Sequence, residues 1–378
     1  MHALSHHHYH TSRLAGLAEI NAMHALRSVA EGVSSIFIPL FLISQGYSLT
    51  SVFGYLFLLS LFWLVTQLIG TRLIGQLGIR GAIALSIVAS IIQYVLLFLL
   101  SSHHIPLALI AFFGGLAVTL FWLPFRIAFI QLLAHHNTAK TVGASNALLI
   151  LAGGVTPAIG GAVATLFGTD ALYGAAIVLF LIALIPLFFL RNIKIPKPKP
   201  VPVKKVLPDL VANGAFNVDD AAEFNVWPLF IFLFLPSYIG VGALASVTLL
   251  AAIGISLYAG AREEQKGVHR YMKAGSWLAT VANFFRVLVS AAAHVFGVNL
   301  VSGSGKSLAL TPFMTRYCIN GERHGITYLN MMLVAGGIGW TLYFGLLTVL
   351  TLGLGAKMVA LIGLLVAAPM MLFVPRMR

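Results

Sequence analysis

Long apolar segments fill almost the whole chain between residues 19 and 374 and are separated by short polar stretches. A membrane-spanning helix needs about 20 mostly apolar residues, and most of these segments supply them. Hydrophobic residues make up 59% of the 378 residues and charged residues only 9%, which is too little charge to cover a soluble protein of this size. The sequence therefore predicts an all-α integral membrane protein surrounded by lipid.

The apolar segments divide into twelve predicted membrane helices. The division between the ninth and tenth helices has no strong turn signal, so we infer it from charge. Basic stretches flank residues 274–315 on both sides, which requires an even number of crossings, and at about 1.5 Å per residue the segment can hold two helices. The predicted helices are 19–44, 50–74, 80–101, 105–133, 141–168, 171–190, 210–235, 238–260, 274–292, 294–315, 326–351 and 354–374.

A basic, proline-rich segment at residues 191–209 separates the sixth and seventh predicted helices. It holds six Lys and Arg residues against one acid, Asp209, and its prolines fix φ and lack an amide donor. We expect an extended, solvated cytoplasmic linker. It divides the chain into an N-terminal six-helix bundle at 19–190 and a C-terminal six-helix bundle at 210–374.

Lysine and arginine residues gather at alternate ends of the predicted helices. Eighteen of the 23 fall in segments that would face the cytoplasm, whereas the outer loops hold only Lys357. Basic residues favour the cytoplasmic side, so the tail at 1–18 and residues 375–378 are predicted to be cytoplasmic, in a bacterial inner membrane. The cations are spread between apolar runs and do not form one face, so nucleic acid is not an expected partner.

The N-terminal tail is polar and His-rich, without the apolar segment or small-residue cleavage site of a cleaved signal peptide. A disordered tail is the favoured interpretation, because nothing nearby in the sequence would organise a metal site. Weak metal binding is the alternative for His6, His7, His8 and His10. We expect no metal centre and no cofactor in this protein.

The two halves of the sequence match each other at a nearly constant offset. IPLFLI around Pro39 matches WPLFIF around Pro228, and Gly78 matches Gly267, both at an offset of 189 residues. A third pair of proline-centred strings, in the fourth predicted helix of each half, matches at 188. These matches in equivalent helices indicate two six-helix pseudo-repeats.

Two short patterns carry a family resemblance. The loop after the second predicted helix of each half reads TRLIGQLGIR, with Gly78 and Arg80, and GAREEQKGVH, with Gly260, Glu264 and Gly267. Together with the basic linker and the two six-helix halves, these patterns resemble the major facilitator superfamily of transporters over essentially the whole chain after the tail. The second pattern is a row of small residues with one proline in the predicted helix 141–168: Gly143, Ala152, Thr156, Pro157, Gly160 and Gly161.

The resemblance implies a role for each pattern. The loops are similar to the family's G-x-L-x-D-x-x-G-x-R motif, although Gly75 stands at the acidic position of the first copy. A charge-based cytoplasmic latch is therefore expected only in the second copy, at Glu264, and tight turns are the alternative role. The helix pattern is similar to the motif of the family's antiporters and favours export. Close helix packing with local bending is the alternative there.

Charged residues inside the predicted helices are the main functional candidates, because a buried charge costs at least about 2.5–3.5 kcal/mol. They fall on the first and fourth predicted helix of each half, and these helices line the central cavity in the family that the chain resembles. Arg286, on the ninth predicted helix, is an exception that the sequence does not explain. The candidates are Glu19, His24, Arg27, Glu31, Arg126, Asp219, Asp220, Glu223 and Lys306.

Two of these acids fall in register between the halves. Glu31 is predicted near the bilayer midplane, and Asp220 lies at the equivalent position, 189 residues later. A carboxylate in a low-dielectric cavity favours its protonated form, whereas a nearby cation favours the ionised form. We therefore predict that proton coupling uses Glu31 together with Asp219 or Asp220. Structural ion pairs, such as Arg27 with Glu31 at i, i+4, are the alternative. The groups expected to contact substrate or tune these acids are Arg27, Arg126, Glu223 and Lys306.

Aromatic residues on the same helices are expected to face lipid or the membrane interface, with cavity lining as the alternative. They are Trp122, Phe125, Phe216, Phe224 and Trp227.

The sequence favours a secondary transporter that moves a small organic solute by alternating access between its two bundles, with proton-coupled efflux as the mode of action. We expect a monomer without enzyme activity. A proton-independent facilitator, or a lipid or amphiphile flippase of the same fold, is the alternative. A membrane-embedded transferase is more distant, since the long acid- and His-bearing loops of such an enzyme are absent.

Overall fold

The computed structural model describes residues 2–133, 138–190, 193–266 and 268–377, and regular secondary structure within these ranges is helical throughout. Among the described residues, eight helical stretches are long and apolar enough to cross a membrane. The chain is therefore an all-α protein of the membrane-spanning class, as predicted.

The helices follow one another with short connections, in the order of the apolar segments. The elements are α1 (His2–Ser34), a 3₁₀ turn (Ser35–Phe37), α2 (Ile38–Ser44), α3 (Leu49–Leu68), α4 (Gly70–Leu99), α5 (Leu107–Leu132), α6 (Thr138–Gly154), α7 (Thr156–Ala183), α8 (Ile185–Phe189), α9 (Val203–Ala221), a π-helical turn (Ala222–Val226), α10 (Trp227–Phe234), α11 (Tyr238–Lys266), α12 (Val268–Phe285), a 3₁₀ turn (Arg286–Leu288), α13 (Ala292–Leu350), α14 (Ala356–Ala367) and a 3₁₀ segment (Ala368–Arg376).

Glycines with positive φ interrupt three of the long helices. The backbone angles φ and ψ are 72° and 169° at Gly78 in α4, 87° and 166° at Gly168 in α7, and 74° and −164° at Gly325 in α13. Residues with a Cβ are almost excluded from this region. Each glycine therefore ends one straight helix and starts the next without a loop. Gly78 and Gly325 lie between helices predicted from the sequence, and Gly168 is the last residue of the predicted helix 141–168.

The N-terminal tail differs from the prediction. Helix α1 begins at His2 and continues through the tail into the apolar segment, so the backbone is helical where we expected disorder. No Gly or Pro interrupts the chain before Gly16, and extending an existing helix is far easier than nucleating one. The side chains of residues 2–14 lie outside the described part of the structure, and the His6–His10 cluster is among them.

The linker is shorter than predicted. Residues 193–202 have no regular secondary structure, and helix α9 begins at Val203, inside the segment we expected to be extended. Asp209, counted as a linker acid, is buried, and its Oδ2 accepts hydrogen bonds from Asn320 Nδ2 and Tyr328 OH, both at 3.0 Å. Hydropathy identifies only the part of a helix that lies in lipid. The start of α9 was therefore missed, because it contains basic residues.

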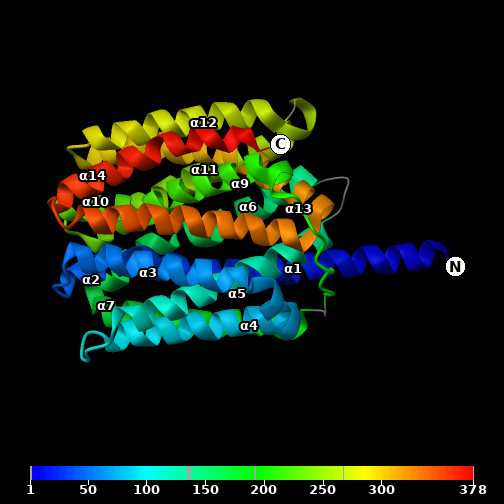
Figure 1. Cartoon of the computed structure of the whole chain (residues 1–378), viewed down its shortest axis with the longest axis horizontal. Coiled ribbons are helices and arrows are strands. Elements are labelled where there is room, and N and C mark those ends of the chain that lie inside the picture. Colours follow the sequence, from blue (N-terminus) through cyan, green and yellow to red (C-terminus); the bar gives the residue numbers. More distant parts are fainter. Residues whose placement is uncertain (1, 134–137, 191–192, 267, 378) are drawn as a thin grey trace.

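Figure 1 shows long helices lying roughly side by side, with both ends of the chain and residues 193–202 toward the same end of the bundle. Helices α3, α4 and α5 lie on one side, and α12 and α14 on the other. We call the part before the linker the first half and the part from α9 onward the second half. Between the halves, α3 packs against α13, and α6 and α7 pack against α11.

Two glycines let helices approach closely at α7. A Cβ at Gly160 would lie 1.9 Å from the Val33 carbonyl oxygen of α1, and a Cβ at Gly161 would lie 2.4 Å from the Tyr238 carbonyl oxygen of α11. Real Cβ atoms do not approach oxygen this closely, so both positions require glycine. The first contact joins two helices of the first half, and the second joins the two halves.

Candidate functional site

A cavity of about 470 Å³ lies between the two halves. The first half contributes side chains from α1, α3, α5 and α6, and the second half contributes side chains from α9, the π-helical turn, α11 and α13. Most of the lining is apolar or aromatic. The ionisable side chains that line it are His24, Arg126, Asp220, Glu223, Lys306, Tyr317 and Cys318.

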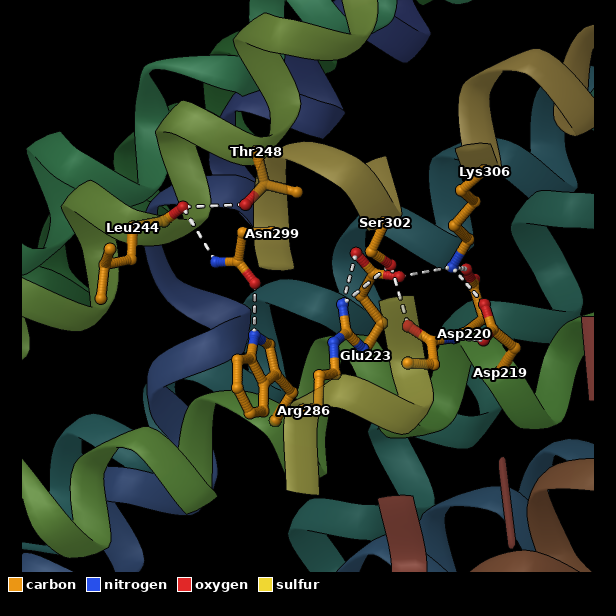
Figure 2. A network of polar contacts seen from close by, with 11 residues as sticks. Asp219, Asp220, Glu223, Leu244, Thr248, Arg286, Asn299, Ser302 and Lys306 are labelled. Atoms are coloured by element: carbon orange, nitrogen blue, oxygen red, sulfur yellow. Dashed lines mark hydrogen bonds and ion pairs between the residues drawn. The ribbon is translucent and has the colours of Figure 1, made fainter. Parts of the chain in front are cut away.

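A group of buried charges occupies the second-half side of this cavity; we call it the acidic cluster (Asp219, Asp220, Glu223, Arg286 and Lys306). Lys306 Nζ lies 2.8 Å from Asp220 Oδ1, 3.1 Å from Glu223 Oε2 and 3.0 Å from Asp219 Oδ2 (Figure 2). Three carboxylates share two cations, so the cluster carries one excess negative charge when every group is ionised.

The π-helical turn places Glu223 in this cluster. Pro228 follows in the first turn of α10 and has no amide hydrogen, so a regular α-helical ladder cannot run through this point. The chain inserts the wider turn at Ala222–Val226. Such turns recur at functional sites, because they rotate side chains out of regular helical register. Here Glu223 reaches cations on two different elements, the turn after α12 and helix α13.

Arg286, which the sequence left unexplained, belongs to the acidic cluster. It is 2% exposed, its Nη2 lies 3.5 Å from Glu223 Oε1, and Nη2 donates to Ser302 Oγ at 3.2 Å (Figure 2). The Arg286 Cζ atom also lies 4.9 Å from the centroid of the Trp227 ring. A signal was present in the sequence: three acids on one predicted helix faced a single lysine, and an unassigned buried arginine was the natural second partner.

Neutral side chains hold the cluster in place. Asn283 Nδ2 donates to Asp219 Oδ1 at 2.7 Å, and Ser302 Oγ donates to Asn283 Oδ1 at 2.8 Å. Trp227 Nε1 donates to Asn299 Oδ1 at 2.7 Å. Asn283, Asn299 and Ser302 were not predicted, because isolated Asn and Ser residues in apolar helices carry no distinctive pattern.

Arg126 lies on the first-half side of the cavity. Its Cζ atom is 5.0 Å from the centroid of Trp122 on α5 and 5.1 Å from that of Tyr317 on α13, so rings from both halves flank the guanidinium. Nε is buried without a hydrogen-bond partner. Among the described residues, no carboxylate lies within ion-pair distance of Arg126.

The pair formed by Arg27 and Glu31 lies outside the cavity lining, which corrects the expectation that both face it. The two side chains approach to 2.6 Å, and Arg27 Cζ lies 3.6 Å from the centroid of Phe121. Arg27 thus has its carboxylate partner within the first half, while its Nε and Nη1 atoms are buried without a hydrogen-bond partner. His24 does line the cavity, packed among aromatic rings, and Glu31 lies three residues beyond the lining residue Ser28 on the same helical face.

The remaining predicted residues have mixed outcomes. Trp122, Phe125, Phe216 and Phe224 line the cavity, so the expectation of lipid-facing positions is wrong for them. Trp227 is buried under Arg286. Glu19 lies on α1 and does not line the cavity. Asp219 is buried and is also not part of the cavity lining.

The described motif residues of the first half, from Gly78 to Gly161, are not among the cavity lining. Arg80 is exposed beside the Gly78 turn, and its Cζ lies 5.7 Å from the centroid of Phe188. Gly143 is buried in α6, and the carbonyl of Pro157 would meet a Cβ placed at Gly242 of α11. Gly260 and Glu264 lie on α11 in a stretch whose side chains are outside the described part, and Gly267 itself is not described.

Comparison with known proteins does not assign a family. No protein-family model matches the chain, and no curated protein matches it.

Proposed function

We propose that the chain is a secondary transporter that moves a small organic solute by alternating access, with the twelve-helix architecture of the major facilitator superfamily. The observation that carries this proposal is the cavity of about 470 Å³, lined from both halves and holding buried ionisable groups. A site shared between two halves opens to either side when one half rocks against the other. Within the described ranges, short connections join the helices and no soluble domain is present.

The described helices support the proposed count of twelve crossings. Positive-φ glycines divide the apolar stretches at 140–189 and 293–350 into two helices each. The stretches α9–α10 and α12 with its 3₁₀ turn are long but carry the buried charges, which lowers their hydropathy. The two divisions and these two further stretches bring the eight apolar stretches to the proposed twelve.

The packing between the halves supports a pseudo-twofold relation. In this count α3 and α11 are the second helices of their halves, and α6 with the start of α7 and the last part of α13 are the fifth. Each second helix packs against the fifth helix of the other half. The strings that match in sequence also share local structure: Pro39 and Pro228 both follow a distorted helical turn, and Pro124 and Pro312 both lie inside long helices.

Proton coupling is assigned to the acidic cluster. Its excess negative charge attracts either a proton or a cationic group of the substrate, and binding of one weakens binding of the other. Of the three carboxylates, Asp220 is the most accessible, with its side chain 30% exposed against 12% for Glu223 and 1% for Asp219. Asp220 is therefore the first candidate for the exchange. Such competition produces antiport, so export driven by proton entry is the proposed mode.

The proposed orientation places both termini and the linker in the cytoplasm, in a bacterial inner membrane. The Lys and Arg distribution supports it. We propose a monomer, because one chain supplies both sides of the cavity.

Proteoliposomes test this function. A library of small organic cations, anions, zwitterions and neutral solutes is screened by electrical recording on supported membranes, with and without a pH gradient. At least one compound should give a current that depends on the gradient. Asp220→Asn should keep substrate exchange at equal, saturating concentrations and lose gradient-driven accumulation, whereas Lys357→Gln, on an exposed helix end, should change neither.

Other outcomes point elsewhere. Transport that ignores the gradient, with Asp220→Asn and Glu31→Gln both fully active, would favour an uncoupled facilitator or flippase. Loss of coupling only in Glu31→Gln would move the proton site to the first half.

A further inference from the structure

Arg126 is a partly buried cation with no carboxylate within ion-pair distance among the described residues. It lines the cavity, its Nε has no hydrogen-bond partner, and its described contacts are the rings of Trp122, Phe125 and Tyr317. Aromatic faces attract a guanidinium but do not neutralise its charge. Guanidinium groups bind carboxylates and phosphates through paired hydrogen bonds, so an anionic group in the cavity would complete the site.

The cavity wall formed by the second half carries an excess negative charge. Asp220, Glu223 and Lys306 line the cavity from the second half, within a cluster that has one carboxylate in excess. No ion pair joins this cluster to Arg126. The two walls therefore do not neutralise each other directly, and each offers one unpaired unit of charge to a ligand.

The space between the charged walls suits an apolar body. Trp63, Trp122, Phe216, Phe313 and Trp340 belong to its lining. The cavity volume of about 470 Å³ falls in the range of roughly 300–1,000 Å³ typical of small-molecule sites.

We propose that the substrates are zwitterions with an aromatic or apolar body, whose anionic group binds Arg126 and whose ammonium group binds the acidic cluster at Asp220 and Glu223. This inference names the substrate class of the proposed transport function and rests on it. The ammonium group occupies the position at which a proton would otherwise balance the cluster. Zwitterion binding and protonation of the cluster therefore oppose each other.

Direct binding to the purified full chain tests the assignment without requiring transport. Three tryptophans line the cavity, so quenching of tryptophan fluorescence reports occupancy. The probes are phenylalanine, its dipeptide and its tripeptide, which increase the separation between the two charges. Each is compared with its N-acetyl form, which lacks the ammonium group, and its C-amide, which lacks the carboxylate. At least one zwitterion should bind about thirtyfold or more tighter than both of its blocked forms.

Two cavity variants assign the charges to their walls. Arg126→Gln should lower the binding affinity of the zwitterion to that of its C-amide. The affinity of the C-amide itself should not change. Asp220→Asn should lower the binding affinity of the zwitterion and leave the affinity of the N-acetyl form unchanged. Arg126→Lys, which keeps the charge but not the forked geometry, should recover part of the affinity. Arg323→Gln, an exposed arginine outside the cavity, is the matched control, and melting temperatures show which variants are folded.

Equal binding of a zwitterion and its C-amide, or an Arg126→Gln variant that binds like the parent, would overturn the inference. If the liposome library yields carried compounds but the zwitterions do not bind preferentially, the substrate class is wrong and the transport function stands. If the zwitterions bind as described but nothing is carried, the transport function fails and the chemistry of the cavity stands.

Discussion

At the residue scale, the acidic cluster shows how a membrane protein keeps several charges in its interior. A single buried charge is costly, but Lys306 contacts three carboxylates, and Arg286 contacts Glu223 and Ser302. Each ion is thereby surrounded by opposite charge or hydrogen-bonding groups. Removal of one partner leaves the others uncompensated, which costs far more than the pair itself contributes.

Replacement of Arg286 by methionine tests this balance. Methionine has a long side chain similar in length to that of arginine but carries no charge. The change therefore raises the excess negative charge of the cluster from one to two. We expect a loss of about 3–5 kcal/mol in the free energy of unfolding, because Arg286 and Glu223 are both buried. Unfolding curves of the purified protein measure it. The double variant Arg286→Met/Glu223→Gln restores the excess to one and should recover part of the loss; no recovery would mean that packing, not charge, explains the effect.

The residues of the candidate site were only partly predictable. The cost of intramembrane charge correctly singled out Arg126, Asp220, Glu223 and Lys306 as cavity residues. The same rule could not distinguish Arg27 from the cavity residues, although the contacts of Arg27 lie within the first half. The aromatic lining was also beyond the sequence, because lipid and an apolar cavity favour the same side chains.

At the element scale, close helix contacts depend on glycines whose neighbours are backbone atoms. Gly160 faces the Val33 carbonyl of α1, which cannot move away as a flexible side chain could. Gly174, in the second part of the same helix α7, has no atom within 4 Å of an added Cβ. The two positions lie in helical segments on either side of the Gly168 turn and differ in surroundings, so they form a matched pair.

Alanine substitution at the two glycines should have opposite effects. Gly160→Ala should cost at least about 1–3 kcal/mol by overpacking against α1. Gly174→Ala should be neutral or stabilise by about 0.5–1 kcal/mol, since alanine favours the helix. Melting temperatures of the two variants compare them. A stable Gly160→Ala protein would show that α1 and α7 are not packed as described.

Helix positions were well predicted from hydropathy, and helix ends were not. The predicted segments 50–74, 105–133 and 354–374 correspond closely to described helices. Helices α9, α11 and α12 extend beyond their apolar parts to Val203, Lys266 and Val268, where basic residues suggested loops. Hydropathy reports contact with lipid, whereas helix formation depends on backbone hydrogen bonding, which continues into water.

At the scale of the whole molecule, alternating access requires two halves that move relative to each other around one cavity. Contacts between the halves differ along the bundle. Tyr238 OH donates to Ser44 Oγ at 3.0 Å near the end opposite the termini, and Gln67 Nε2 donates to Asn330 Oδ1 at 2.7 Å between α3 and α13. Few hydrogen bonds cross between the halves at these two places, beside the helix packing, and such bonds can break and reform during rocking.

Distances between spin labels at the two ends test alternating access most directly. Cysteines are placed at the exposed residues Gln45 and Leu352 for the end opposite the termini, and at Gln76 and Arg323 for the end that holds them, with the native Cys318 changed to serine. Distances are recorded in lipid at high and low pH, with and without a zwitterionic probe. Alternating access predicts reciprocal changes, with one pair of labels moving apart as the other pair approaches. Distances that stay fixed at both ends, or that change together in the same direction, would contradict it.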